Sequence, residues 1–160
     1  PTRGLMGYTS RFLTLTKGTG VINRTFHSFG DYAGDLEGRR NGALVSMENG
    51  KAVAYAIFNL QDRGEFFITH NDPVYEGMLV GLGSKSGDLI VNVLKGKKLT
   101  NVRASGADEN VVLTPVRNMS ISEMLGMLNT DEALEITPKS CRLRKAILNP
   151  HERKRQAKAS

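Results

Sequence analysis

The residues with the clearest chemical potential lie between Asn92 and Glu109, where basic side chains stand among small and polar ones. The basic residues are Lys95, Lys97, Lys98 and Arg103, and the small and polar ones include Gly96, Thr100, Asn101, Ser105 and Gly106. Glycine lets a backbone approach phosphates closely, and lysine and arginine pair with phosphate oxygens. We therefore predict a loop that contacts nucleic acid. The alternative is an ordinary exposed connection, but connections this long are usually functional or disordered.

A second basic segment lies near the end of the chain. Residues 139–158 contain eight basic side chains and one acidic one, whereas residues 1–138 contain 14 basic and 15 acidic ones. A local surplus of this kind suits a polyanionic partner, although basic tails are often only solvated. The residues that we expect to contact RNA here are Arg142, Arg144, Lys145, Arg153, Lys154 and Arg155. The loop from Asn92 to Glu109 has no aromatic residue, so phosphate and shape contacts should dominate over base stacking.

Several kinds of chemistry lack their minimal sequence motifs. The chain has no G-x-x-x-x-G-K-[ST], G-x-S-x-G or H-E-x-x-H motif, which argues against nucleotide binding and hydrolysis in these residues. One cysteine and three histidines match no zinc spacing, so we expect no metal, no cofactor and no catalytic residue. No apolar run approaches the length of a membrane helix. A small β-rich enzyme with a pocket built from distant residues stays open as a rival.

The first part of the chain has the pattern of a helix followed by a strand. Apolar residues recur at helical spacing from Leu5 to Thr16, and Lys17-Gly18 is a helix-ending pair. Residues 21–29 alternate as a strand does. One helix and one strand resemble the second half of an α/β unit. The glycine-rich and charged residues 30–41 then suggest a linker, where we place a domain boundary.

The middle of the chain has the pattern of a small β-barrel or sandwich. Asn49-Gly50 between the β-prone runs 43–47 and 52–60 predicts a tight hairpin. Further strands are expected at residues 65–69, 78–82, 89–94 and 110–114.

The last third combines one helix with two more strands. Ser120 and Glu123 form a capping-box pattern that predicts a helix. Strands are expected at residues 133–137 and 140–145, and alternation puts Cys141 on a buried face, opposite Arg142 and Arg144. Asn149-Pro150 then opens a short basic helix or tail. The fold class is therefore α+β: half of a ferredoxin-like α/β unit, then a mainly β, barrel-like domain with one interposed helix, and a basic C-terminal helix or tail.

Five stretches resemble the C-terminal region of the BipA (TypA) translational GTPases. They are RGLMGYTSRFLTLTKGTG (3–20), AIFNLQDRGEFFITH (56–70), VYEGMLVG (74–81), KGKKLTNVRASG (95–106) and EITPKSCRLRK (135–145). The resemblance spans almost the whole chain. It implies that residues 1–37 are the second half of an elongation-factor-G-like domain five, residues 38–148 the family-specific C-terminal domain, and residues 149–160 a basic tail or short helix.

The resemblance also implies a function. The chain would be the ribosome-, tRNA- and rRNA-binding module of a GTP-dependent factor that acts in stress response and large-subunit assembly. Its loop from Asn92 to Glu109 would lie near the acceptor arm of the A-site tRNA, while GTP and Mg²⁺ would belong to a GTPase domain elsewhere in the parent protein. We expect a monomer in the bacterial cytoplasm or the plastid stroma. The alternative is a stand-alone RNA-binding protein of ribosomal type.

Overall fold

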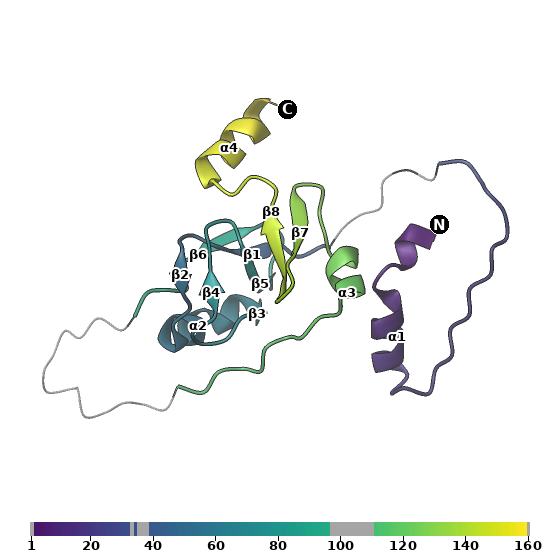
Figure 1. Ribbon diagram of the computed structural model, residues 1–160, viewed down its shortest axis with the longest axis horizontal. Coiled ribbons are helices and arrows are strands. Elements are labelled where there is room, and N and C mark those ends of the chain that lie inside the picture. The colour runs from purple at the N-terminus through teal and green to yellow at the C-terminus, as the bar shows by residue number, and fades with distance from the viewer. Residues whose placement is uncertain (1, 33, 35–38, 97–110, 160) are drawn as a thin grey trace, which may run out of the picture.

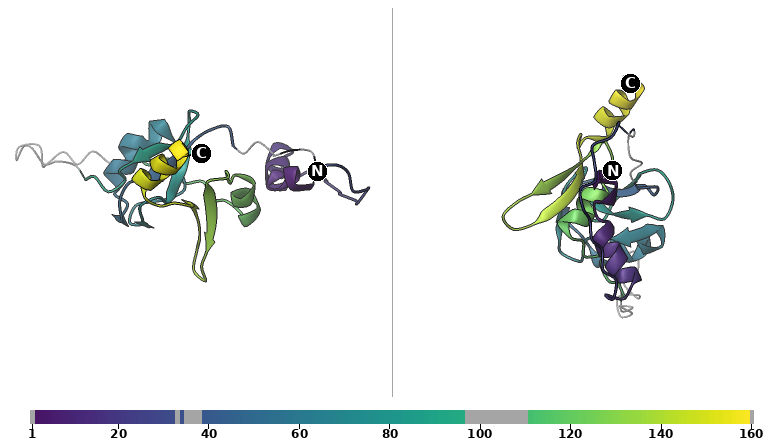
Figure 2. Two further views of the ribbon diagram at one scale, coloured as in Figure 1. Left: turned by 90° about the horizontal axis from the view of Figure 1, so that it is seen from above. Right: turned by 90° about the vertical axis from the view of Figure 1, so that its right-hand side faces the viewer.

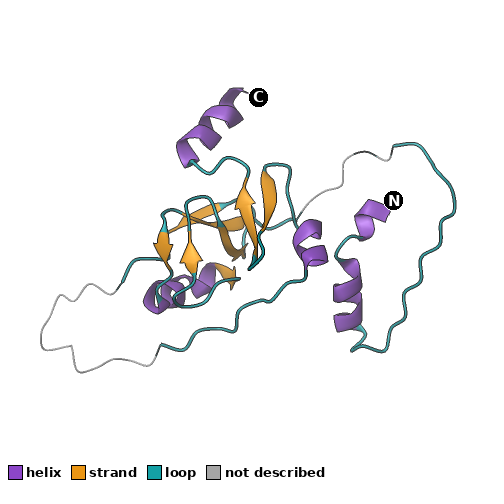
Figure 3. Ribbon diagram, viewed as in Figure 1, coloured by secondary structure: helices purple, strands orange, loops and turns teal. Residues whose placement is uncertain are grey.

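A computed structural model describes residues 2–32, 34, 39–96 and 111–159. The described strands form one four-stranded sheet and two two-stranded sheets, and the N-terminal helix lies to one side of them (Figure 1, Figure 3). In chain order the elements are η1 (Thr2–Leu5), α1 (Tyr8–Leu15), β1 (Ala43–Ser46), β2 (Gly50–Lys51), α2 (Ala54–Leu60), η2 (Gln61–Arg63), β3 (Gly64–Phe66), β4 (Pro73–Val74), β5 (Leu79–Gly83), β6 (Leu89–Val91), α3 (Ile121–Gly126), β7 (Glu132–Ile136), β8 (Cys141–Lys145) and α4 (Pro150–Ala159). The predicted α+β class with a mainly β second part is confirmed.

The main sheet has the strand order β3-β5-β1-β6, with β1 antiparallel to β5 and parallel to β6. All four residues of β1 are buried, because the two faces of the strand serve two different apolar clusters. On one face Leu44 packs in the cluster that contains Ile57 of α2. On the other face Ala43 and Val45 pack with Leu143 of β8. The sheet is thus covered on one side by α2 and on the other by the β7–β8 hairpin.

The hairpin predicted around Asn49-Gly50 is wrong. Its first strand, β1, is central in the sheet and takes β5 and β6 as neighbours, while Gly50–Lys51 pairs with β4. The second predicted strand is instead helix α2. Its buried residues Ala56 and Ile57 lie at helical spacing from the partly buried Leu60, so the apolar pattern of this short run suits a helix as well as a strand.

Two further predicted strands are not formed. Residues 21–29 are extended but unpaired among the described residues, and Phe29 is 94% exposed. A strand needs a neighbour for its backbone groups, which alternation alone does not supply. Residues 111–114 also lie outside any sheet, and Asn110 lies outside the described residues. Further along the chain, the Arg117 N–H donates to the Phe66 carbonyl of β3 (3.0 Å), and the Arg117 guanidinium donates to Glu65 (3.1 Å).

Two predicted helices are confirmed. The capping box at α3 has both of its bonds: the Ser120 hydroxyl accepts from the Glu123 N–H, and the Glu123 carboxylate accepts from the Ser120 N–H. The predicted first helix is α1, which ends as expected where the Gly18 N–H donates to the Leu13 carbonyl (2.7 Å). It begins later than predicted, after Gly7. That residue has a φ of +73° and lies against the backbone of α3, where a Cβ would come within 3.0 Å of the Ser122 carbonyl oxygen.

The β7–β8 hairpin projects from the main sheet, and α4 follows it (Figure 2). Its five antiparallel residue pairs run from Glu132 opposite Lys145 to Ile136 opposite Cys141. The last residue of β8 bonds to the main body, since the Lys145 N–H donates to the Gly77 carbonyl (2.8 Å). Cys141 is half-buried instead of buried as predicted, because it lies near the projecting end of the hairpin. The predicted domain boundary at residues 37 and 38 falls outside the described residues and stays a prediction.

Candidate nucleic-acid interface

The predicted basic loop begins beside α2 and β2. The Val53 N–H donates to the Val93 carbonyl (2.9 Å), and the Leu94 N–H donates to the Asn92 side-chain oxygen (3.0 Å). These bonds fix the chain just before Lys95, which is exposed. The other predicted contact residues of this loop lie outside the described residues, and their role stays a prediction: Lys97, Lys98, Thr100, Asn101, Arg103 and Ser105.

The β7–β8 hairpin presents charged residues on both of its faces. Strand alternation places Lys145 on the same face as the buried Leu143, whereas Arg142 and Arg144 lie on the opposite face. On β7, Glu132 stands opposite Lys145 and Glu135 stands opposite Arg142. Each face therefore combines acidic and basic side chains, but the two sets have very different surroundings.

The inner face carries an ion-pair network made by Arg39, Asp88, Asp131, Glu132 and Lys145. The Lys145 ammonium lies 2.9 Å from the Glu132 carboxylate and 2.7 Å from Asp131, and it also contacts Asp88. Arg39 donates to both carboxylate oxygens of Glu132, at 2.5 Å each. The Lys145 and Glu132 side chains are only 2% and 0% exposed. The network ties the hairpin to the residues that precede β1 and β6.

Hydrogen bonds within this network outweigh the cost of burying its charges. Burial by itself would raise the pKa of Glu132, but bonds from Arg39, Lys145 and the Asn129 N–H hold that pKa below its ordinary value. The pKa of Asp88 is lowered in the same way: bonds from the Ala43 N–H and Lys145 overcome burial. Burial would lower the pKa of Lys145, yet its bonds to Asp131, Asp88 and Glu132 raise it. All three groups are therefore held in their charged forms.

Lys145 was predicted to contact RNA, and its placement does not fit that prediction. The side chain is buried, and its ammonium is occupied by three carboxylates. A phosphate could reach it only by breaking the network, which would take from the buried Glu132 carboxylate one of its two cations. We therefore leave Lys145 out of the candidate interface.

The outer face carries a looser group of charges, the outer cluster, formed by Tyr75, Glu135, Arg142 and Arg144. The Tyr75 hydroxyl donates to the Glu135 carboxylate at 2.8 Å. Arg142 and Arg144 lie 3.5 Å and 3.7 Å from that same carboxylate. Their side chains are 28% and 32% exposed. Two predicted contact residues are thus together on one accessible face, with one acidic neighbour between them.

The hydroxyl of Tyr75 is a hydrogen-bond donor throughout the physiological range. Burial raises its pKa to about 12, and the bond to Glu135 adds to the increase. Arg144 is held from its other side, because its guanidinium also donates to the carbonyl of Lys145 (3.1 Å). The donors of the outer cluster are therefore positioned in advance of any ligand.

Helix α4 carries the remaining predicted residues, and the structure separates them into two roles. Arg153 donates to the carbonyls of Ile147 (2.8 Å) and Leu148 (2.5 Å), so its guanidinium fixes the turn that leads into the helix. Lys154 and Arg155 are exposed. Lys158 is exposed too and lies one turn after Lys154, on the same side of the helix.

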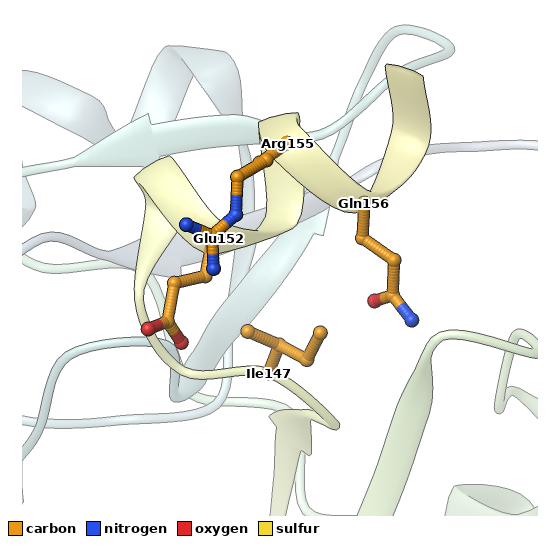
Figure 4. A pocket seen from close by; sticks show the side chains of 4 residues that line it. All are labelled: Ile147, Glu152, Arg155 and Gln156. Atoms are coloured by element: carbon orange, nitrogen blue, oxygen red, sulfur yellow. The ribbon is translucent and has the colours of Figure 1, made fainter. Parts of the chain in front are cut away.

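The start of α4 is set by the predicted cap. The Asn149 side-chain oxygen accepts from the His151 N–H (2.9 Å) and the Glu152 N–H (3.2 Å). A shallow hollow lies between the helix and the preceding turn and is lined by Ile147, Glu152, Arg155 and Gln156 (Figure 4). One carboxylate and one guanidinium share this hollow, so it has no strong preference for an anion.

Three members of the site were not found from the sequence. Lys158 lies in the basic segment but is not among the residues predicted to contact RNA. Its helical spacing from Lys154 could have identified it. Glu135 faces Arg142 across the β7–β8 ladder, which strand pairing could have revealed. Tyr75 comes from a distant turn and had no signal in the local sequence.

The described residues offer little support for other site types. In residues 2–32, 39–96 and 111–159, no group of three or more His, Cys, Asp or Glu side chains could hold a metal ion. Within the same ranges, no helix combines the length and apolar character needed to cross a membrane.

Comparison with known proteins gives a consistent set of relatives. Residues 41–150 match the family model described as the TypA/BipA C-terminal domain. The chain is 49% identical over 160 residues to the Large ribosomal subunit assembly factor BipA of Escherichia coli K12. It is 50% identical over 159 residues to the protein of that name from Bacillus subtilis 168. Both alignments cover 99% of this chain but 26% of the relative, so the chain spans about a quarter of the length of these curated relatives.

Proposed function

Because the chain belongs to the TypA/BipA C-terminal domain family, we propose that it is the module that docks a BipA-type translation factor on ribosomal RNA. The relatives are named as large ribosomal subunit assembly factors, which supports a role at the ribosome. The observation that carries the proposal is the separation of charge along the chain. Eight basic residues and one acidic residue lie in residues 139–158, while the rest of the chain is nearly balanced.

The proposed interface has two parts. The first is the loop from Asn92 to Glu109, which we assign to the acceptor arm of an A-site tRNA and to neighbouring rRNA. The second is the accessible basic surface of the hairpin and α4, which we assign to the rRNA backbone. Its members are Arg142, Arg144, Lys154, Arg155 and Lys158.

The nucleotide chemistry of such a factor belongs elsewhere in this proposal. Ribosome-dependent GTP hydrolysis, with its GTP and Mg²⁺, is assigned to a part of the protein outside these 160 residues. The absence of a G-x-x-x-x-G-K-[ST] motif from the sequence supports that assignment. The module itself would act as a monomer in the cytoplasm, or in the stroma of a plastid, during stress response and large-subunit assembly.

Co-sedimentation with purified ribosomes tests the loop assignment. Replacing Lys97, Lys98 and Arg103 together by alanine should weaken ribosome binding by about tenfold or more, because three phosphate partners are lost. Circular dichroism of the variant should match that of the parent chain, so that the weaker binding reports the missing charges and not a lost fold.

A charge-matched variant controls for the loss of three positive charges. Arg40, Arg63 and Lys85 are exposed and lie outside both proposed parts, so their replacement by alanine should weaken binding by less than about threefold. Equal binding by the loop variant and the parent chain would show that the loop is not the contact.

A further inference from the structure

Three donors of the outer cluster converge on one carboxylate. Tyr75 donates to one oxygen of Glu135 at 2.8 Å, Arg142 lies 3.5 Å from the other oxygen, and Arg144 lies 3.7 Å from the first. The cluster has two positive charges and one negative charge. One unit of positive charge is therefore left on the outer face of the hairpin.

The two arginines are only partly satisfied by this carboxylate. Each guanidinium has five N–H donors, and a well-formed pair with a carboxylate has N–O distances near 2.8 Å. Arg39 reaches Glu132 at 2.5 Å through two nitrogens, whereas Arg142 and Arg144 approach Glu135 from 3.5 Å and beyond. Glu135 is thus a weak and exchangeable partner.

The arrangement suits a phosphodiester better than a small free anion. A backbone phosphate has one negative charge and oxygens that accept from arginine and tyrosine donors. Three of its four members lie on the projecting β7–β8 hairpin (Figure 2), and these two arginines and Glu135 are each about one-third exposed. A polymer can lay its backbone across such an open surface, and the basic residues of α4, which follows the hairpin in the chain, can hold further phosphates of the same polymer.

We propose that Tyr75, Arg142 and Arg144 form a binding site for an RNA backbone phosphate, in which Glu135 holds the phosphate position and is displaced when RNA binds. The inference rests on the proposed function and identifies where one of its contacts is made. Glu135 keeps the arginines oriented in the free protein, and its release lowers the net affinity for RNA. Removing the carboxylate should therefore strengthen RNA binding.

The test is the affinity of the full chain for a short fluorescent RNA duplex, measured by anisotropy at about 0.1 M salt. Glu135→Gln should bind about fivefold more tightly than the parent chain, because a competing exposed ion pair is worth up to about 1 kcal/mol. Glu65→Gln is the matched control. Glu65 lies on the edge strand β3, outside the outer cluster, and pairs with Arg117 at 3.1 Å; its replacement removes the same charge.

A double-mutant cycle separates this site from a general effect of charge. In a chain with Arg142→Ala and Arg144→Ala, the Glu135→Gln change should no longer strengthen binding. Equal gains from Glu65→Gln and Glu135→Gln would overturn the inference, as would a gain that persists without the arginines. If Glu135→Gln does not fold, Arg142→Lys with Arg144→Lys replaces it: binding as tight as the parent's would contradict a site built on guanidinium geometry.

The duplex assay and the ribosome assay can fail separately. A chain that sediments with ribosomes but shows no difference between Glu135→Gln and Glu65→Gln would keep the proposed function and lose this site. A chain that binds neither ribosomes nor the duplex would lose both.

Discussion

Both faces of the β7–β8 hairpin carry acidic and basic side chains, but the two faces differ in how far these side chains are buried. On the inner face Lys145 and Glu132 are almost fully buried, and their charged atoms lie 2.9 Å apart. On the outer face Glu135 lies 3.5 Å from Arg142, and both side chains are about one-third exposed. Burial makes an unpaired charge costly, so the inner charges must stay together, while the exposed charges can change partners.

This difference separates structural from functional basic residues within one short segment. Arg144 and Lys145 are neighbours on β8 and contribute equally to the net charge. Only the position of each side chain relative to the sheet decides which one can meet a polyanion. Arg153 on α4 shows the same principle, because its guanidinium is bonded to two backbone carbonyls.

The largest expected effect is the loss of the inner cation. Lys145→Met should lower the free energy of unfolding by about 3 kcal/mol, since it takes from the buried Glu132 carboxylate one of the two cations that pair with it. Urea denaturation followed by circular dichroism measures this loss. Lys139→Met, at the exposed tip of the hairpin, is the matched control and should change the stability by less than about 0.5 kcal/mol.

The outer face should respond much less to a comparable change. Arg144→Met should lower the free energy of unfolding by less than about 1 kcal/mol, as expected for an exposed ion pair. The same urea experiment compares the two variants directly. Equal losses from Lys145→Met and Arg144→Met would remove the distinction between the two faces.

The smallest expected effect is a change in the response to acid. The pKa of Glu132 is lowered because its hydrogen bonds outweigh burial, and the pKa of Asp88 is lowered likewise. The stability that they supply is complete above the ordinary carboxyl range of about 4 and is lost as the pH falls through the lowered values.

Glu132→Gln should therefore flatten the loss of stability between about pH 5 and pH 3. Urea midpoints at several pH values measure this slope. An acid response identical to that of the parent chain would show that Glu132 does not contribute to it.

Sequence patterns correctly predicted the elements that depend on hydrogen bonds between residues close together in the chain. The capping box at Ser120 and the cap at Asn149 involve partners within a few residues, and both are formed. The alternation in residues 140–145 correctly set Arg142 and Arg144 apart from Leu143. The same alternation also places Lys145 on the inner face, so its burial was partly visible in the sequence.

Features that depend on distant partners could not be predicted in this way. The Asn49-Gly50 pair has a local preference for a hairpin, but β1 gains more by pairing with β5 and β6 in a buried sheet. The partners of Lys145 include Asp88, and those of Glu135 include Tyr75, both far away in the chain. Sequence spacing therefore located the basic segment but did not separate its buried cation from its accessible ones.

The most direct test of the docking role is the salt dependence of ribosome binding. If the module neutralises about four phosphates, the logarithm of its affinity should fall with the logarithm of the salt concentration with a slope of roughly −3 to −4, from counterion release. Co-sedimentation over a range of potassium chloride concentrations measures that slope. A slope in this range is the predicted result, and an affinity that hardly changes with salt would contradict an interface built on phosphate contacts.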